Sequence, residues 1–172
     1  MNRARGKLVF QQLPENFNPK VEIVGCFLTV NDNVLFLKRL PHKSEGSKWG
    51  VPGGKVEKGE NADHAVLREV FEETGIDLAG KPLKYFGKVY IRYPEVDFLY
   101  HMYGHDLEEF KNQVVINPEE HTEHCWFTLA EALELPLIRG EDECIYLVYG
   151  RDLSMLPRDS ASCNDVGKQI SE

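Results

Sequence analysis

Three glutamates, Glu69, Glu72 and Glu73, stand close together in a segment with helical spacing. At about 100° per residue they fall within an arc of roughly 100° on a helix, and apolar residues occupy much of the remainder. Neighbouring carboxylates on an exposed helix repel by about 0.2–0.5 kcal/mol per pair. A hard divalent cation reverses that effect, because Mg²⁺ and Mn²⁺ prefer carboxylate oxygens. The spacing therefore indicates a metal centre, and the alternative is a solvated acidic helix face.

A glycine pair and clear helix ends position these carboxylates. Gly53 and Gly54 precede the helix, and glycine lets a backbone carbonyl or amide approach a metal or phosphate closely. Asn61 is the expected N-cap, Asp63 lies in the first turn, and Gly75 is the expected residue just past the end. We therefore expect a glycine-rich loop followed by one amphipathic helix.

The same segment resembles a family signature. Gly54, five residues, Glu60, seven residues and then Arg68-Glu69-Val70-Phe71-Glu72-Glu73-Thr74-Gly75-Ile76 is similar to the Nudix box, Gly-x5-Glu-x7-Arg-Glu-U-x-Glu-Glu-x-Gly-U, where U is aliphatic. Every fixed position matches, and the preceding Trp49-Gly50-Val51-Pro52 also resembles the approach to the box in many Nudix enzymes. The chain thus resembles the Nudix hydrolase family, which includes MutT-like enzymes.

The resemblance implies roles for residues of the box. The family's members are Mg²⁺-dependent hydrolases of nucleoside diphosphates linked to another group, and Mn²⁺ is a substitute metal. By resemblance Glu69, Glu72 and Glu73 are catalytic metal ligands, and the Gly53 carbonyl completes the metal shell. Arg68 pairs with Glu60 in such proteins, which would support the loop rather than touch the substrate. An ordinary surface ion pair is the alternative for Arg68 and Glu60.

Residues outside the box are expected to complete the site. The resemblance favours Glu120 over Glu119 and Glu123 as a further metal ligand or general base, and solvated loop acids are the alternative. It leaves open whether Glu69 or Glu120 is the base. Lys55, or Arg39 at the end of a strand, would meet a substrate phosphate as a positive charge; a solvated lysine is the alternative for Lys55.

Composition limits the partners of the chain. The 172 residues carry a net charge of −8, which argues against a general nucleic-acid surface. No apolar run approaches the ~18 residues that span a bilayer, and no apolar segment follows the basic N-terminus, so we predict neither a membrane span nor a signal peptide. The four cysteines lie far apart with no Cys-x-x-Cys pair, and we interpret them as reduced thiols of a cytoplasmic protein.

Hydrophobic patterning predicts an α/β chain. Strands are expected at residues 8–10, 21–30, 34–40, 83–92, 96–105 and 124–128, and helices at the box, at 129–133 and at 140–150. The family resemblance implies an α/β/α sandwich with a mixed sheet, a topology that periodicity alone would not fix. We expect a single domain over residues 1–156 and a polar C-terminal tail over 157–172.

One predicted strand offers a candidate binding face. Along 96–105 the residues Leu99, His101, Tyr103 and His105 alternate with Phe98, Tyr100 and Met102. The mixed histidine and aromatic face is a candidate nucleobase surface, and an ordinary packed sheet face is the alternative.

Three functions compete. The favoured one is a nucleoside triphosphate pyrophosphohydrolase that acts on an ordinary, damaged or non-standard nucleotide. The second is a Nudix hydrolase of ADP-ribose, a dinucleoside polyphosphate or capped RNA. The third is a non-catalytic nucleotide-binding module, against which the intact box argues. The sequence does not name the nucleobase, the leaving group or the phosphorus attacked, and exposed strand edges would allow a homodimer.

Overall fold

A mixed sheet with helices on both faces forms the framework of the protein. The computed structural model describes residues 6–110 and 114–150. In these residues the strands are β1 (Val9–Phe10), β2 (Pro19–Val30), β3 (Asn33–Arg39), β4 (Trp49–Gly50), β5 (Gly53–Lys55), β6 (Lys84–Arg92), β7 (Asp97–Asp106) and β8 (His121–Thr128). The helices are α1 (Ala62–Thr74), α2 (Leu129–Leu133) and α3 (Glu141–Tyr149). The expected strands and helices are all present, with ends shifted by up to three residues.

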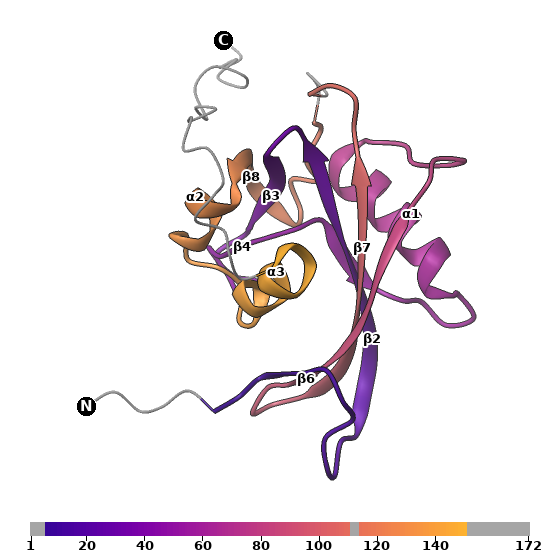
Figure 1. Cartoon of the computed structure of the whole chain (residues 1–172), viewed down its shortest axis with the longest axis vertical. Helices are drawn as coiled ribbons and strands as arrows, with labels where there is room; N and C mark the ends of the chain where they lie inside the picture. The colour runs from indigo at the N-terminus through magenta and orange to yellow at the C-terminus, as the bar shows by residue number, and fades with distance from the viewer. Residues whose placement is uncertain (1–5, 111–113, 151–172) are drawn as a thin grey trace.

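The sheet is organised around β2. Its order is β1-β6-β7-β2-β3-β4, with β5 also paired to β2 and β8 to β3 (Figure 1). β2 runs parallel to β7 and antiparallel to β5 and β3, so the sheet is mixed. Because β2 lies in the interior of the sheet, its residues 24–28 form a continuous run of buried residues.

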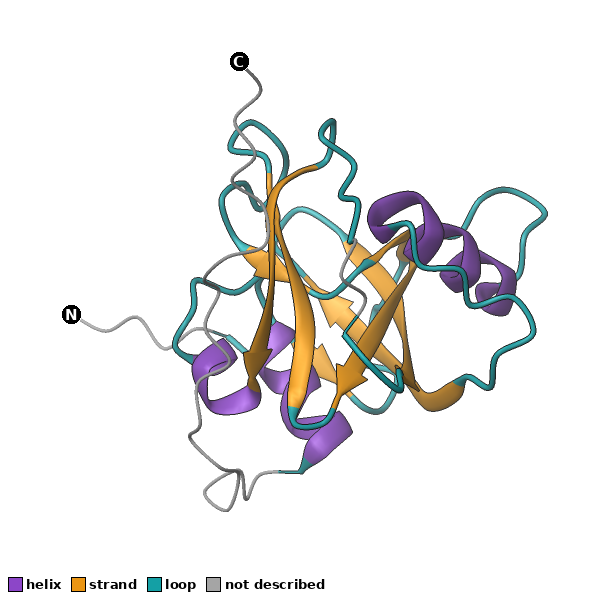
Figure 2. Ribbon diagram, turned by 90° about the horizontal axis from the view of Figure 1, so that it is seen from above, coloured by secondary structure: helices purple, strands orange, loops and turns teal. Residues whose placement is uncertain are grey.

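Two apolar clusters lie on the two faces of the sheet, and Figure 2 shows helices on both sides of the strands. One contains Ala65, Val66 and Val70 of α1 packed against residues such as Val24 and Leu35. The other contains residues of α2 and α3 packed against Phe27, Phe36, Val89 and Tyr100. The predicted α/β/α sandwich with a mixed sheet is therefore confirmed.

Two parts of the chain differ from the expectation. The glycine pair expected in a loop belongs to β5, where Gly53 pairs with Gly25 and Gly54 with Val24. A Cβ on Gly53 would lie 2.1 Å from the Val24 carbonyl oxygen, so the close approach of the two strands requires glycine. The last strand begins at His121 rather than at residue 124, because it follows β3 back to Arg39.

The cysteine expectation is only partly confirmed. Cys26 and Cys144 are buried free cysteines, whereas Cys125 is disulfide-bonded, so the prediction of a reduced thiol is wrong for that residue. In the described residues no helix is long and apolar enough to cross a membrane. The C-terminal tail predicted at 157–172 lies outside the described residues.

Candidate active site

Helix α1 sets the positions of the box glutamates. Asn61 caps its start by accepting a hydrogen bond from the His64 amide at 2.9 Å, and Gly75 ends it in the left-handed conformation with φ of 71°. Both predicted ends are confirmed. With its apolar face against the sheet, α1 presents Glu69 and Glu73 toward β5 and Glu72 toward solvent.

The glutamates occupy three different environments. Glu73 is 6% exposed, and its Oε2 accepts a hydrogen bond from the Gly53 amide at 2.8 Å. Glu69 is half-buried and lies directly against Gly54, where a Cβ would come within 2.4 Å of its carboxylate. The Glu72 side chain is 54% exposed. The expected cluster is thus present along one helix border, but its members are not equivalent.

Arg68 joins the glutamates to the glycine strand. Its guanidinium contacts both Glu60 oxygens at 2.9 and 3.0 Å, Glu69 at 2.8 Å and Glu72 at 3.2 Å. It also donates to the Lys55 carbonyl at 2.9 Å. The hydrogen bonds from Arg68 lower the pKa of Glu60 to about 2, with a further contribution from the Glu57 amide. The predicted Arg68–Glu60 pair is therefore present, and it anchors β5 to the helix.

Burial dominates the electrostatics of Glu73. Loss of hydration raises the pKa of Glu73 to about 8, and the nearby Glu69 raises it further, while the Gly53 hydrogen bond acts in the opposite direction. His121 Nε2 lies 3.8 Å from Glu73 Oε1. Since burial lowers the pKa of His121 to about 4, that contact joins a neutral imidazole to the carboxyl rather than forming an ion pair at neutral pH. Without a cation nearby, ionised Glu73 is costly.

These carboxylates suit a hard divalent cation. Glu69, Glu73 and Glu120 line one cavity, and ionising the buried Glu73 would be favoured by a positive ion beside it. In residues 6–110 and 114–150 no three His, Cys, Asp or Glu side chains are already arranged as a metal cluster. Arg68 contacts one carboxylate oxygen of Glu69 and one of Glu72, which leaves the second oxygen of each without a bond to that guanidinium.

The structure separates the three candidate acids beyond the box. Glu119 is exposed and does not line the cavity. Glu120 lines the cavity and pairs with Lys43 at 3.0 Å. Glu123 lies within β8, away from the cavity lining, and pairs with Lys38 at 2.9 Å. The structure therefore brings Glu120, and not Glu123, to the box glutamates.

The two side chains predicted to meet a substrate phosphate line the cavity, and a third cationic side chain lies with them. Lys55 and Arg39 both line the cavity, with Arg39 Nε donating to the Ser44 carbonyl at 2.8 Å. Lys43 also lines it, and sequence reasoning missed this residue because only the return of the loop after β3 brings it to Glu120. The cavity thus combines acidic and basic side chains at its α1 side.

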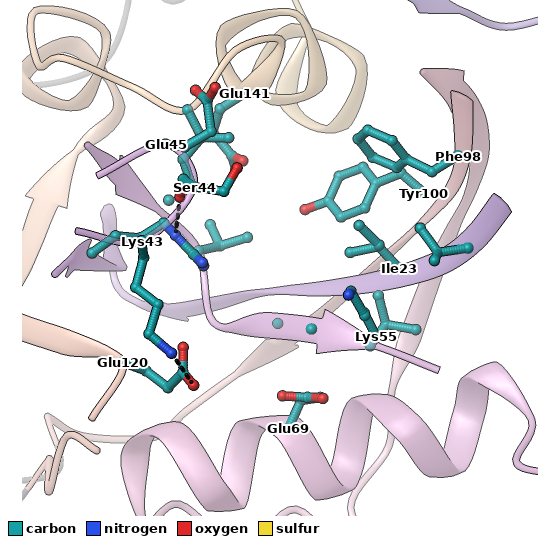
Figure 3. A pocket seen from close by; sticks show the side chains of 18 of the residues that line it. Ile23, Lys43, Ser44, Glu45, Lys55, Glu69, Phe98, Tyr100, Glu120 and Glu141 are labelled. Atoms are coloured by element: carbon teal, nitrogen blue, oxygen red, sulfur yellow. Dashed lines mark hydrogen bonds and ion pairs between the residues drawn. The ribbon is translucent and has the colours of Figure 1, made fainter. Parts of the chain in front are cut away.

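The cavity measures about 750 Å³ and extends from α1 across the sheet to the start of α3 (Figure 3). Its far wall includes Ile23, Phe98 and Tyr100, together with Glu141 from α3. The candidate nucleobase face predicted on His101 and Tyr103 is wrong for this cavity. Tyr103 instead donates a hydrogen bond to Asp63 of α1 at 2.6 Å, and the opposite face of β7 lines the cavity.

Comparison with known protein families identifies the family of this chain. The sequence matches the NUDIX domain family over residues 19–148. The chain therefore belongs to the Nudix family.

Individual relatives support this assignment. An 8-oxo-dGTP diphosphatase of Proteus vulgaris is 40% identical over 60 residues, which cover 34% of this chain and 54% of the relative. An RNA pyrophosphohydrolase of Actinobacillus succinogenes is 33% identical over 79 residues, covering 46% of this chain and 37% of the relative. The solved structure of a MutT NUDIX hydrolase from Burkholderia pseudomallei has a TM-score of 0.62 and 27% identity, covering 74% of this chain and 95% of that one. The matched segments span about a third to a half of the curated relatives.

Proposed function

We propose that this protein hydrolyses a phosphoanhydride bond in a nucleoside diphosphate derivative with the aid of Mg²⁺. The favoured substrate is a nucleoside triphosphate, from which pyrophosphate is released. The observation that carries the proposal is the convergence of Glu69, Glu73 and Glu120 at one side of a cavity of about 750 Å³, a volume that accommodates a nucleotide.

The proposed metal ligands are the box glutamates Glu69, Glu72 and Glu73, together with Glu120 and the Gly53 carbonyl. A bound Mg²⁺ would neutralise charge on the phosphoryl oxygens and make its bound water more acidic, and Mn²⁺ could replace it. The fit of these residues to the ion rests on their oxygen donors and on the burial of Glu73.

The remaining residues supply charge, support and proton transfer. Lys55 and Arg39 contribute positive charge toward the substrate phosphates, and Lys43 lies within reach of the same wall of the cavity. Arg68 and Glu60 position β5 against α1 without touching the substrate. Glu120 is favoured as the base that takes the proton from the attacking water, because it lines the cavity near Glu73 but belongs to the segment before β8 rather than to α1; Glu69 is the second candidate.

Two other functions remain as alternatives. A larger conjugate such as ADP-ribose, a dinucleoside polyphosphate or capped RNA would use the same glutamates and a wider opening. A non-catalytic nucleotide-binding module would retain binding without turnover. The relatives are named for different activities, one on 8-oxo-dGTP and one on RNA, so similarity does not choose among substrates.

We further propose that the protein is cytoplasmic, and a homodimer remains a prediction.

A substrate panel tests the proposal. Ordinary and oxidised nucleoside triphosphates, ADP-ribose, diadenosine tetraphosphate and RNA bearing a 5′-triphosphate are incubated with Mg²⁺, and the products are resolved by phosphorus NMR. Pyrophosphate released from a nucleoside triphosphate supports the favoured substrate, whereas hydrolysis confined to a conjugate supports the second function. Glu73→Gln serves as the inactive control. Binding of nucleotides without any turnover across the panel would overturn the enzymatic proposal.

A further inference from the structure

The end of the cavity farthest from the box glutamates has a different chemical character. We call it the α3 end and define it by Ile23, Phe98, Tyr100, Ile138 and Glu141, all of which line the cavity. Figure 3 shows Glu69 on one side of the β5 ribbon, with Glu141 and the Phe98 and Tyr100 rings on the other. These five residues are mostly apolar or aromatic, with Glu141 as their one carboxyl, and the paired side chains Glu45, Glu95 and Arg139 line the cavity beside them.

That carboxyl is buried and incompletely partnered. Glu141 is 6% exposed, and no described residue offers a hydrogen-bond partner to its Oε1. The Val51 amide donates to the carboxyl, and Oε2 lies toward Gly50, 3.8 Å from where a Cβ would stand. Burying a polar oxygen without a partner destabilises the folded state, so an unsatisfied oxygen in a cavity wall calls for an explanation.

The surroundings of Glu141 supply no compensating charge. Arg139, which lines the same cavity, is already paired with Glu45 and Glu95 and lies over the Tyr93 ring. Burial raises the pKa of Glu141 to about 8, with the neighbouring Asp142 as a smaller cause in the same direction. At neutral pH the carboxyl is therefore mainly protonated, and one of its oxygens carries a donor hydrogen.

We propose that the α3 end of the cavity binds the heterocyclic base of the substrate and that Glu141 is the residue that selects among bases, through a hydrogen bond from Oε1 to the base edge. This inference rests on the proposed function, because it concerns the substrate of the same cavity. With Val51 donating to the carboxyl, the protonated oxygen would face a carbonyl oxygen or an unprotonated ring nitrogen. The apolar wall formed by Ile23, Phe98 and Tyr100 would cover the rest of the ring.

Glu141 also has a simpler structural reading. It is the first residue of α3, where an acidic side chain interacts favourably with the helix dipole, and its contact with Val51 ties α3 to the segment between β4 and β5. A structural role of this kind would affect all substrates equally. A role in selection would change the ranking of substrates that differ only in their base.

Three variants separate the two readings. Glu141→Met removes the polar oxygen at similar volume, Glu141→Gln keeps a neutral donor, and Asp142→Asn changes an exposed charge next to it on α3. We measure kcat/KM for nucleoside triphosphates that differ only in the base. The ratio between the best and the poorest base should fall about tenfold or more in Glu141→Met. It should stay within about threefold of the wild-type ratio in Glu141→Gln and in Asp142→Asn.

A ratio that is unchanged in Glu141→Met would overturn the inference, as would an equal loss for every base. If Glu141→Met does not fold, Glu141→Asp replaces it, because the shorter side chain withdraws the carboxyl by one methylene while keeping its chemistry. The same fall in the ratio is then expected, and its absence would count against selection by Glu141.

A binding experiment without turnover distinguishes failure of this inference from failure of the proposed function. Nucleosides that lack phosphate are added to the metal-free protein, and saturation-transfer NMR reports contact with the base protons. Transfer in the wild type that is lost in Glu141→Met and kept in Asp142→Asn supports base binding at the α3 end, even if no substrate is hydrolysed. No transfer in the wild type, or equal transfer in all variants, overturns it.

Discussion

Gly54 lies directly against the carboxylate of Glu69. A Cβ on Gly54 would stand 2.4 Å from the Glu69 Cδ and from Oε2, closer than real Cβ contacts allow. Gly54 does not have a positive φ angle, so its backbone conformation does not require glycine. It leaves space for the carboxylate that α1 points at the cavity.

Gly54→Ala should consequently damage activity more than stability. The added methyl group meets the flexible end of Glu69, so the carboxylate turns aside while the strand keeps its pairing with β2. We expect kcat to fall by at least about tenfold, because misplacing a functional group by about 1 Å can cost 10²-fold. The free energy of unfolding should change by less than about 1 kcal/mol.

Gly80→Ala is the matched control for that substitution. Gly80 has φ of 71° and nothing within 4 Å of its Cβ position, so alanine there is strained but does not clash. It should lose roughly 1 kcal/mol of stability, measured by urea unfolding, and keep its kcat. A Gly54→Ala protein with unchanged kcat would mean that the position of Glu69 is not important for turnover.

Divalent metal should both stabilise the protein and activate it. If Glu69, Glu72 and Glu73 bind Mg²⁺, the melting temperature should rise with Mg²⁺ concentration, because a ligand that binds only the folded state stabilises it. Hydrolysis should require millimolar Mg²⁺ or Mn²⁺ and stop in excess EDTA. Glu73→Gln should abolish both responses. Undiminished turnover in EDTA would contradict the metal-dependent mechanism, whatever the melting temperature does.

Glu120 and Glu123 should differ sharply when each is replaced by glutamine. Glu120 lines the cavity next to Lys43, whereas Glu123 pairs with Lys38 outside it. At saturating Mg²⁺, Glu120→Gln should lose on the order of 10²-fold in kcat, and Glu123→Gln should stay within about twofold of the wild type. Steady-state kinetics on both variants checks this. If both stay active, Glu69 becomes the leading candidate for the base.

The helix that carries the box could be predicted from the sequence because local rules determine it. Asn61, Gly75 and the 3.6-residue spacing act within α1 itself, and the Arg68–Glu60 pair lies only eight residues apart in the chain. Capping and periodicity need no knowledge of the rest of the fold. The family motif then supplied the topology that periodicity could not.

Other parts of the site depend on long-range pairing. The short strand β5 is fixed by β2, and the start of β8 is fixed by β3, so neither could be found from local patterns. The face of β7 that lines the cavity depends on where α1 packs, and therefore Phe98 and Tyr100 replaced the predicted His101 face. Glu141 was not identified because an acidic residue at a helix start is common. Only its burial and its unpartnered oxygen distinguish it.

The last prediction concerns the effect of Glu141 on stability. Burial raises the pKa of Glu141 from about 4.3 in the unfolded chain to about 8 in the folded protein. The folded state therefore binds the Glu141 proton more tightly, so its favourable contribution is fully present below about pH 4.3 and is lost as the pH rises toward 8. Glu141→Gln does not titrate and should lack this loss.

The comparison is made by urea unfolding of wild type and Glu141→Gln between pH 4.5 and 7.0. The free energy of unfolding of the variant should rise relative to that of the wild type across this range, by up to about 3 kcal/mol if the full pKa difference between the folded and unfolded states contributes. Asp142→Asn, which alters an exposed carboxyl on the same helix turn, should keep most of the wild-type pH dependence, with a slightly smaller loss because Asp142 is a lesser cause of the raised pKa of Glu141. Parallel curves for wild type and Glu141→Gln would show that Glu141 is not buried as a neutral acid. Glu141 would then meet the base as a carboxylate, which accepts hydrogen bonds but cannot donate them. The favoured bases would be those that present an N–H donor rather than a carbonyl oxygen or an unprotonated ring nitrogen.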